Sequence, residues 1–431
     1  MSGRRCEACG AALSGLTAEP VCPTCHAVTR HRPPLVPARR LLPSVWLWST
    51  PESARALRSR DLATILRLYR RLNQLNQEQL ATVLGYDKTY VSMIETGRRV
   101  INDMTTRRHI ATALGLPTHV LGVTSHDDAD FAAMIQFGDS TVRLAESARQ
   151  AGRAVDSVNE LWPLVARLEA RIAEGHAERD TLILLSHART ALGVSLGTVL
   201  PEERLAAAAR WTGRGLAVAE RLDDRASLAL ALRMHGNELR KADHARAAVA
   251  HLARAAAISD DAEGRGAALA LLARAAGELG DPELFDTAIS GYRSLLDGVA
   301  VHSMLVNPFT FNEIHLRGLV STGRAPKAAR IMDTGSPNAP AAPQWHVIER
   351  VTAAEVLLVA GRPDGAEDAL RAAVVAAEAH CLPHQIQRAI RAADHGGLTR
   401  IGIEGREALH RIDALLAPPR SAFAAHEGMN R

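Results

Sequence analysis

The chain has 431 residues, enough to form more than one hydrophobic core, so we expect two or three domains. Only 3% of the residues are aromatic, and a composition rich in alanine and arginine favours packed helices over a β-sandwich or barrel. No window offers the roughly 18 uninterrupted apolar residues of a membrane helix. Residues 1–10 also lack the apolar core of a signal peptide, so we expect a cytoplasmic protein with no membrane partner.

The net charge of +4 is unevenly distributed along the chain. Residues 1–125 contain 17 Lys or Arg and 8 Asp or Glu, a balance of +9, which leaves 34 basic and 39 acidic residues for the rest. A basic first third on an acidic body indicates that the N-terminal part meets a polyanion. The alternative is a chance distribution in an arginine-rich sequence.

Four cysteines near the N-terminus form two short pairs. Cys6 and Cys9 are separated by two residues, Cys22 and Cys25 repeat that spacing, and 12 residues lie between the pairs. Two such pairs supply the four thiolates of a tetrahedral Zn²⁺ site, and a complete set leaves no open position for catalysis. We therefore predict a structural Zn²⁺ ion in a zinc-ribbon-like module over residues 1–32, whose folding depends on the metal.

Residues 33–55 are predicted to be a Pro/Arg-rich linker. Four prolines lie between positions 33 and 43, together with Arg39 and Arg40, and this composition favours an extended, basic segment that could follow a phosphate backbone. Trp46 and Trp48 are expected to dock the linker on the next domain.

From residue 61 onward the apolar residues repeat with the period of a helix. Four helices are expected, at about residues 61–72, 77–84, 87–95 and 103–114. Asn76 is a good N-cap for the second helix and Asp87 for the third. Gly85 suits the left-handed residue that ends the second helix and opens a tight turn.

Two helices that cross steeply over a short turn need a small residue at the contact, glycine at the turn and apolar anchors on the second helix. The residues that meet these demands are Ala81, Gly85, Val91 and Ile94. Together with Gln77 and the closing Ile-Glu-Thr-Gly, they resemble the helix-turn-helix of the XRE family, the phage lambda repressor-like domains, over roughly residues 60–122. The resemblance implies a five-helix DNA-binding domain, which we assign to residues 56–125.

The resemblance also implies how this domain meets double-stranded DNA. Gln77 would contact a phosphate at the mouth of the major groove. The exposed residues of the third helix would face base edges, namely Lys88, Thr89, Tyr90, Ser92 and Met93. Phosphate contacts that carry no sequence information would come from Thr96, Arg98 and Arg99. Domains of this type usually bind two half-sites as dimers, so a homodimer is implied.

Helical patterns continue from residue 126 to about residue 417. Residues 126–175 are expected to be connecting helices, residues 176–417 a repeat domain, and residues 418–431 a flexible tail. The best register resembles the tetratricopeptide repeat of roughly 34 residues, through Leu232, Gly236, Leu239, Ala248, Leu252 and Ala255. The five-residue spacing from Asp243 to Ala248 recurs at 323–328 and 361–366, where a turn glycine replaces the aspartate. We predict four to six helical hairpins in a solenoid, with an irregular helical bundle as the alternative.

Such an array has a concave surface lined by the first helix of each hairpin. The residues expected to face it are Arg233, Asn237, Arg240 and Lys241 in the best repeat, and Glu313 and Arg317 in a later one. Their chemistry suits planar groups such as a peptide bond or a carboxylate. The alternative for each side chain is an ordinary solvated surface or an ion pair within the array.

The sequence thus predicts a mainly α protein: a lambda repressor-like domain followed by a tetratricopeptide-like α-solenoid, with a small N-terminal zinc ribbon. It resembles transcriptional regulators whose repeats dimerise or respond to a peptide, a small molecule or a protein partner, so we expect a nucleoid-associated DNA-binding regulator. The alternative is a protein-interaction scaffold whose helix-turn-helix does not read DNA. We do not expect an enzyme, because paired carboxylates, a glycine-rich phosphate loop and an open metal site are all missing from the sequence.

Overall fold

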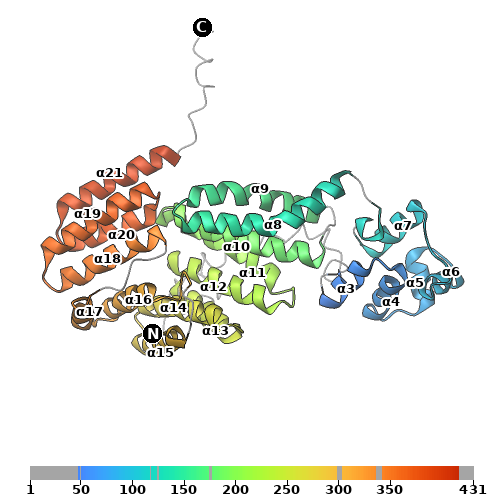
Figure 1. Ribbon diagram of the computed structural model, residues 1–431, viewed down its shortest axis with the longest axis horizontal. Coiled ribbons are helices and arrows are strands. Elements are labelled where there is room, and N and C mark those ends of the chain that lie inside the picture. The colour runs from blue at the N-terminus through green and yellow to red at the C-terminus, as the bar shows by residue number, and fades with distance from the viewer. Residues whose placement is uncertain are drawn as a thin grey trace, which may run out of the picture.

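The computed structural model describes residues 47, 48, 50–116, 118–123, 126–173, 177–298, 303–335 and 342–416. All regular elements in these ranges are helices, and no strand occurs in them, which confirms the mainly α fold. The short helices α3–α7 lie at one end of the long axis and α18–α21 at the other (Figure 1). The predicted zinc-ribbon-like module, most of the linker and the C-terminal tail fall outside the described residues, as do Cys6, Cys9, Cys22 and Cys25.

From residue 50 to 123, the described residues of the N-terminal lobe form five α-helices and one 3-10 turn. These are α3 (Pro51–Ser59), α4 (Leu62–Leu72), α5 (Gln77–Leu84), α6 (Lys88–Glu95), α7 (Met104–Leu114) and η1 (Thr118–Leu121). A side-chain oxygen of Thr50, Asp61, Asn76, Asp87 or Asp103 caps each α-helix by accepting a backbone N–H bond from its first turn. Such caps satisfy donors that a helix leaves unpaired, so the predicted starts at Asn76 and Asp87 are confirmed.

The start of α3 differs from the prediction. Residues 51–55, predicted as the end of the extended linker, instead form the first part of this helix. Pro51 fits the first helical position because the missing N–H is not needed there, and Oγ1 of Thr50 accepts from the N–H of Ser53 at 3.1 Å. Trp48 docks as expected: its indole N–H donates to the carbonyl of Leu114 at 3.0 Å, and its ring stacks on Tyr69.

The body begins with an antiparallel pair, α8 (His126–Gln150) and α9 (Ala154–Ala173), and continues as a solenoid-like stack of hairpins. Its helices pair as α10 (Arg179–Val199) with α11 (Leu205–Ala219), α12 (Arg225–Lys241) with α13 (Ala245–Ile258), α14 (Ala262–Leu279) with α15 (Pro282–Gly298), α16 (Pro308–Ser321) with α17 (Ala325–Met332), α18 (Pro343–Val359) with α19 (Pro363–Ala379), and α20 (Pro383–His395) with α21 (Thr399–Leu416). The 3-10 turn η2 (Glu202–Arg204) precedes α11. The described part of the chain therefore holds six hairpins, at the upper end of the predicted range.

The hairpin turns follow the predicted spacing. Gly323 and Gly361 adopt φ angles of 76° and 71°, and Asp243 takes the equivalent place with φ of 63°. Glycine occupies such left-handed positions without strain, whereas aspartate pays a moderate cost. The register around Gly236 also holds, because Ala248 and Leu252 are completely buried and a Cβ on Gly236 would lie 2.7 Å from Cγ of Leu252.

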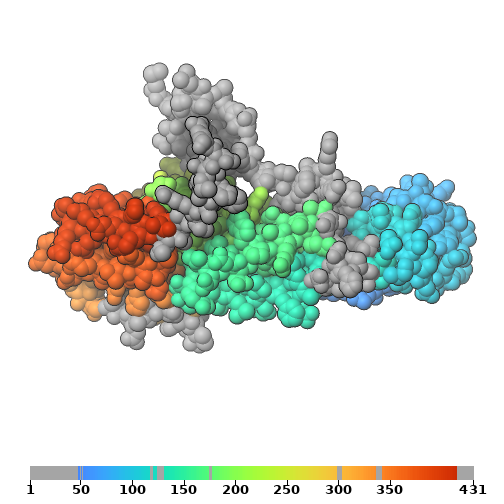
Figure 2. Space-filling model, turned by 90° about the horizontal axis from the view of Figure 1, so that it is seen from above, coloured from blue at the N-terminus to red at the C-terminus, as the bar shows by residue number. Residues whose placement is uncertain are grey.

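The last hairpin closes back on the first. A side-chain nitrogen of Arg391 on α20 donates to Glu202 at 2.8 Å, and the amide of Gln387 donates to Glu203 at 2.8 Å. The backbone N–H of Glu202 donates in turn to the amide oxygen of Gln387 at 2.8 Å. The solenoid is therefore a closed ring rather than an open arc at this point. In Figure 2, the N-terminal lobe and the C-terminal hairpins form the two ends of the molecule, with the intermediate helices between them.

Helix α10 runs between these two ends (Figure 1). At its first turn, Asp180 accepts two hydrogen bonds from Arg58 on α3, at 2.9 and 3.1 Å. Its other end leads into η2, where the ring closes. By length and composition α10 resembles a membrane-spanning helix, and 78% of its most apolar window is buried inside the protein.

Helices α14 and α16 cross at a pair of glycines. A Cβ on Gly277 would lie 3.1 Å from Cα of Gly318, and a Cβ on Gly318 would overlap the ring of Phe285. Phe285 is completely buried, so its ring cannot turn aside into solvent. Close packing of these helices thus depends on a missing side chain.

We expect Gly318→Ala to lower the free energy of unfolding by about 1–3 kcal/mol, the usual cost of overpacking a filled core. Urea unfolding followed by circular dichroism measures the loss. Gly298→Ala is the matched control, since nothing lies within 4 Å of the added Cβ. Equal stability of the two variants would contradict the glycine crossing.

Candidate nucleic-acid interface and inner cavity

Helix α6 and the turn after it carry most of the residues predicted to meet DNA. Lys88, Thr89, Thr96, Arg98 and Arg99 are exposed, whereas Tyr90, Ser92 and Met93 are half-buried. Val91 and Ile94 point the other way, into the core of the lobe. The tight turn before α6 has the predicted glycine, Gly85, with φ of 68°.

Gln77 has a partner that sequence reasoning missed. Its side-chain amide donates to one oxygen of Glu95 at 2.7 Å, and Nε of Arg70 donates to the other at 2.9 Å. Glu95 is only 3% exposed, so its charge needs these donors. The three residues connect α4, the start of α5 and the end of α6, and so fix the angle at which α6 is presented. The available signal was the glutamate in the closing Ile-Glu-Thr-Gly.

Three further contacts restrain the exposed residues of α6. The guanidinium carbon of Arg99 lies 4.5 Å from the ring centre of Tyr90, a cation–π distance. The ring of Tyr90 also packs against Tyr86, with centroids 4.8 Å apart. The hydroxyl of Thr96 donates to the carbonyl of Ser92 at 2.8 Å. Lys88 is freer, since its nearest carboxylate, on Glu78, is 4.0 Å away.

We expect Arg70→Ala to lower the free energy of unfolding of the lobe by about 1–3 kcal/mol, because the buried carboxylate of Glu95 then loses a charged donor. Thermal or urea unfolding of the full chain measures this. Arg71→Ala is the control: Arg71 is 65% and its partner Glu52 46% exposed, and a pair so well solvated contributes at most about 1 kcal/mol. Equal losses would show that the buried network does not hold α6.

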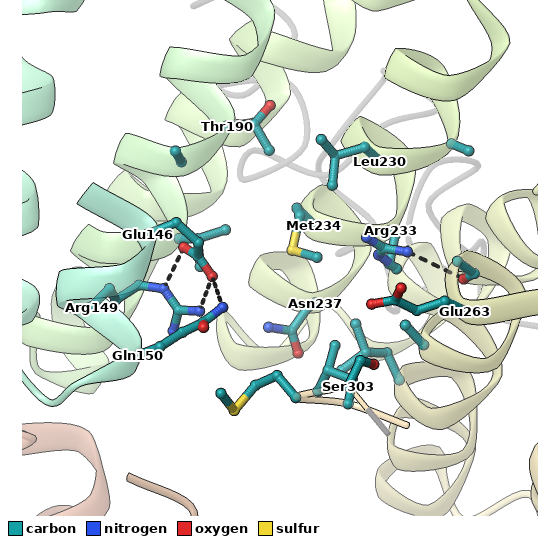
Figure 3. Close-up of a pocket in the computed structure, with 18 of the residues that line it drawn as sticks. Glu146, Arg149, Gln150, Thr190, Leu230, Arg233, Met234, Asn237, Glu263 and Ser303 are labelled. Carbon is teal, nitrogen blue, oxygen red and sulfur yellow. Dashed lines mark hydrogen bonds and ion pairs between the residues drawn. The ribbon is translucent and has the colours of Figure 1, made fainter. Parts of the chain in front are cut away.

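A cavity of about 810 Å³ lies inside the ring. Its walls come from α8, α10, α12, α14, α18, α20 and residues 303–305, so both ends of the solenoid contribute. Figure 3 shows Glu146, Arg149 and Gln150 from α8 on one side and Arg233 with Glu263 on the other, with Met234 and Asn237 between them. The volume is within the range of pockets that hold a small organic ligand.

The predicted concave-surface residues divide into two groups. Arg233, Asn237, Arg240 and Lys241 line the cavity. Glu313 and Arg317 lie behind the wall instead: Glu313 is fully buried and accepts from the hydroxyl of Thr352 at 2.8 Å, and Arg317 donates to Glu278 at 2.6 Å. The sequence missed the contribution of α8, because this helix lies outside the repeats and only the folded ring brings it to the cavity.

Charged side chains on the inner helices are mostly paired. The pairs are Arg149 with Glu146, Lys241 with Glu238, Arg240 and Arg317 with the shared Glu278, and Arg388 with Glu355. Burial alone would raise the pKa of Glu278, but Arg240 and Arg317 outweigh it and hold that pKa below its usual value. The inner face therefore carries a network of ion pairs whose cations are largely buried. Among the described residues, no three His, Cys, Asp or Glu side chains are arranged to hold a metal ion.

A family model described as a helix-turn-helix domain matches residues 61–121, which span α4 to η1. The chain carries a helix-turn-helix domain. This match covers the crossing of α5 and α6 and the exposed face described above.

Among solved structures, the chain is similar to PlcR of Bacillus thuringiensis, solved in complex with the peptide PapR7 and DNA. The two are 16% identical, with 55% of this chain and 94% of the PlcR chain covered and a TM-score of 0.29. A circular tandem repeat protein with a novel repeat topology is also 16% identical, with 85% of this chain and 94% of its own covered and a TM-score of 0.17. No curated protein matches the chain.

Proposed function

We propose that the protein is a sequence-specific transcriptional regulator of the XRE type, in which α6 reads DNA and the tetratricopeptide-like body receives an effector. The observation that carries the proposal is the helix-turn-helix match over residues 61–121 on a lobe that presents α6 to solvent. The balance of +9 over residues 1–125 supports attraction to a polyanion.

The geometry of α6 suits the major groove. Lys88 and Thr89 stand at its N-terminal end, the part of a recognition helix that contacts base edges. Arg98 and Arg99 follow its C-terminal end, where they can neutralise phosphates on the groove wall. Restraint of Tyr90 between Arg99 and Tyr86 reduces the entropy lost when its ring meets a base.

Direct contacts connect the lobe to the cavity, which supports control of DNA binding by an effector. Arg58 on α3 pairs with Asp180 on α10, and the next residue back, Arg179, donates to the carbonyls of Leu222 and Asp223 just before α12. Two and three helical turns further along α10, His187 and Thr190 line the cavity. An effector that moves α10 or α12 would therefore act on the surface that supports the lobe.

Binding to duplex DNA tests the proposal. We expect the full chain to bind a fragment from upstream of its own gene more tightly than a shuffled duplex, with affinity that falls steeply as salt rises. Lys88→Ala combined with Thr89→Ala should abolish this preference, since each base contact contributes about 1–3 kcal/mol of discrimination. Fluorescence anisotropy measures the dissociation constants for the upstream fragment and for the shuffled duplex. If the double variant still prefers the upstream fragment, α6 is not the helix that reads the DNA sequence. If the chain shows no salt-dependent DNA binding, the alternative of a protein-interaction scaffold is favoured.

Arg98→Ala should act differently from the α6 variant. We expect it to weaken binding to both duplexes equally and to reduce the slope of log affinity against log salt by about 1, as for one lost phosphate contact. Arg400→Ala is the matched control: Arg400 is 80% exposed and lies on α21 at the far end of the molecule. A change in sequence preference with Arg98→Ala would contradict its role as a phosphate contact.

The N-terminal cysteines are proposed to hold one structural Zn²⁺, through Cys6, Cys9, Cys22 and Cys25. Metal analysis of the reduced chain should find about one zinc per chain, lost when Cys9 and Cys22 are both replaced by Ser. Reduced protein free of zinc would overturn this assignment.

We also propose that the chain is a homodimer on DNA, as lambda repressor-like domains usually are.

A further inference from the structure

Arg274 is a cation on the inner face that has no partner among the described residues. Arg274, on α14, lines the cavity and is only 7% exposed, yet it makes no hydrogen bond or ion pair with any described residue. Its Nε is buried without a partner. The neighbouring inner cations each have a carboxylate within 2.8 Å. A buried charge without a counterion is costly to the folded state.

Charges of both signs lie around Arg274. Burial lowers the pKa of its guanidinium well below the usual value, and Arg240 and Arg317 lower it further, which outweighs the opposite effects of Glu313 and Glu278. Nearby, burial also lowers the pKa of His384, with Lys241 and Arg240 as the next causes. Nδ1 of His384 is a second buried polar atom without a partner at this cavity. An anion placed here would meet several cations. Of the two carboxylates that act on Arg274, Glu278 pairs with Arg240 and Arg317, whereas Glu313 does not line the cavity and its Oε2 has no hydrogen-bond partner.

The wall beside Arg274 is apolar and aromatic. Its guanidinium carbon lies 5.3 Å from the centre of the Trp345 ring, and Leu271 and Ile348 line the same cavity. A guanidinium offers a flat fork of N–H donors that fits a carboxylate or a phosphate. The cavity is much larger than such a group alone, so the remainder of a ligand would lie against the apolar wall.

We propose that Arg274 anchors an anion site inside the ring, and that the effector is an organic acid whose carboxylate or phosphate binds Arg274 while an apolar, planar part packs against Trp345. This inference rests on the proposed effector function, but the site itself is defined without reference to DNA. The anion would supply the direct ion pair that Arg274 does not make with any described residue. It would also make direct contact with α14 through Arg274 and with α18 through Trp345.

Titration calorimetry on the full chain without DNA tests the site with three probes of similar shape: benzoate, phenyl phosphate and the neutral benzamide. We expect an anion to bind at least about tenfold more tightly than benzamide, since charge-assisted hydrogen bonds are much stronger than neutral ones. The tighter of benzoate and phenyl phosphate identifies the acidic group. Equal binding of benzamide, or failure of both anions to bind, would overturn the proposal.

Arg274→Met should abolish the preference for anions and, without ligand, raise the melting temperature, because it removes an unpaired buried charge. Arg388→Met is the matched control. Arg388 is equally buried but pairs with Glu355 at 2.7 Å, so its loss should lower the melting temperature and leave anion binding unchanged. Arg274→Lys keeps the charge and should retain part of the affinity. A melting temperature lowered by Arg274→Met together with unchanged anion binding would show that Arg274 is a structural residue.

The anion site and the DNA-binding function can be refuted independently of each other. If Arg98→Ala and the α6 variant leave DNA binding unaffected while benzoate or phenyl phosphate binds through Arg274, the anion site stands and the DNA-reading assignment falls. If the DNA results hold and no anion binds, only the nature of the effector is wrong.

Discussion

Closure of the hairpin stack on itself is the constraint on which the cavity depends. Glu202 and Glu203 meet Gln387 and Arg391, so the first and last hairpins become neighbours. These pairs are largely exposed, and each contributes little energy by itself. Their effect is geometric: an open arc would leave its inner face in bulk water, whereas a ring encloses it and lowers the local dielectric. Inner charges then have to find partners, and Glu278 serves two arginines at once.

The same constraint separates what the sequence predicts from what it does not. Asn76, Asp87 and Gly85 act through bonds a few residues away, so local composition identifies them. The repeat register around Gly236 is likewise predictable, because each hairpin packs mainly on its neighbour. Glu146 and Arg149 are different, since their place at the cavity depends on α8 lying against helices far along the chain. No periodicity within α8 carries that information.

Individual assignments of inner residues show the same limit. Helical spacing placed Arg233, Asn237, Glu313 and Arg317 on one surface. The curvature of the stack turns the first two to the cavity, whereas Glu313 is buried and the half-buried Arg317 does not line the cavity. Gln77 is a comparable case in the lobe. The resemblance to lambda repressor-like domains predicts that Gln77 contacts a DNA phosphate. In the structure its side-chain amide donates to the buried Glu95. Residues at a helix start often serve the fold and a surface together.

Helix α10 combines three connections in one rigid element: Asp180 under the lobe, His187 and Thr190 at the cavity, and the chain into η2 at the ring closure. A helix of 21 residues is about 30 Å long at 1.5 Å per residue. If an effector binds in the cavity, as proposed, any shift of α10 at His187 would be carried directly to Asp180 under the lobe, about 10 Å away along the helix axis. In the DNA-bound homodimer proposed above, such a shift would change the spacing between the two recognition helices, which half-sites on a duplex require to be fixed.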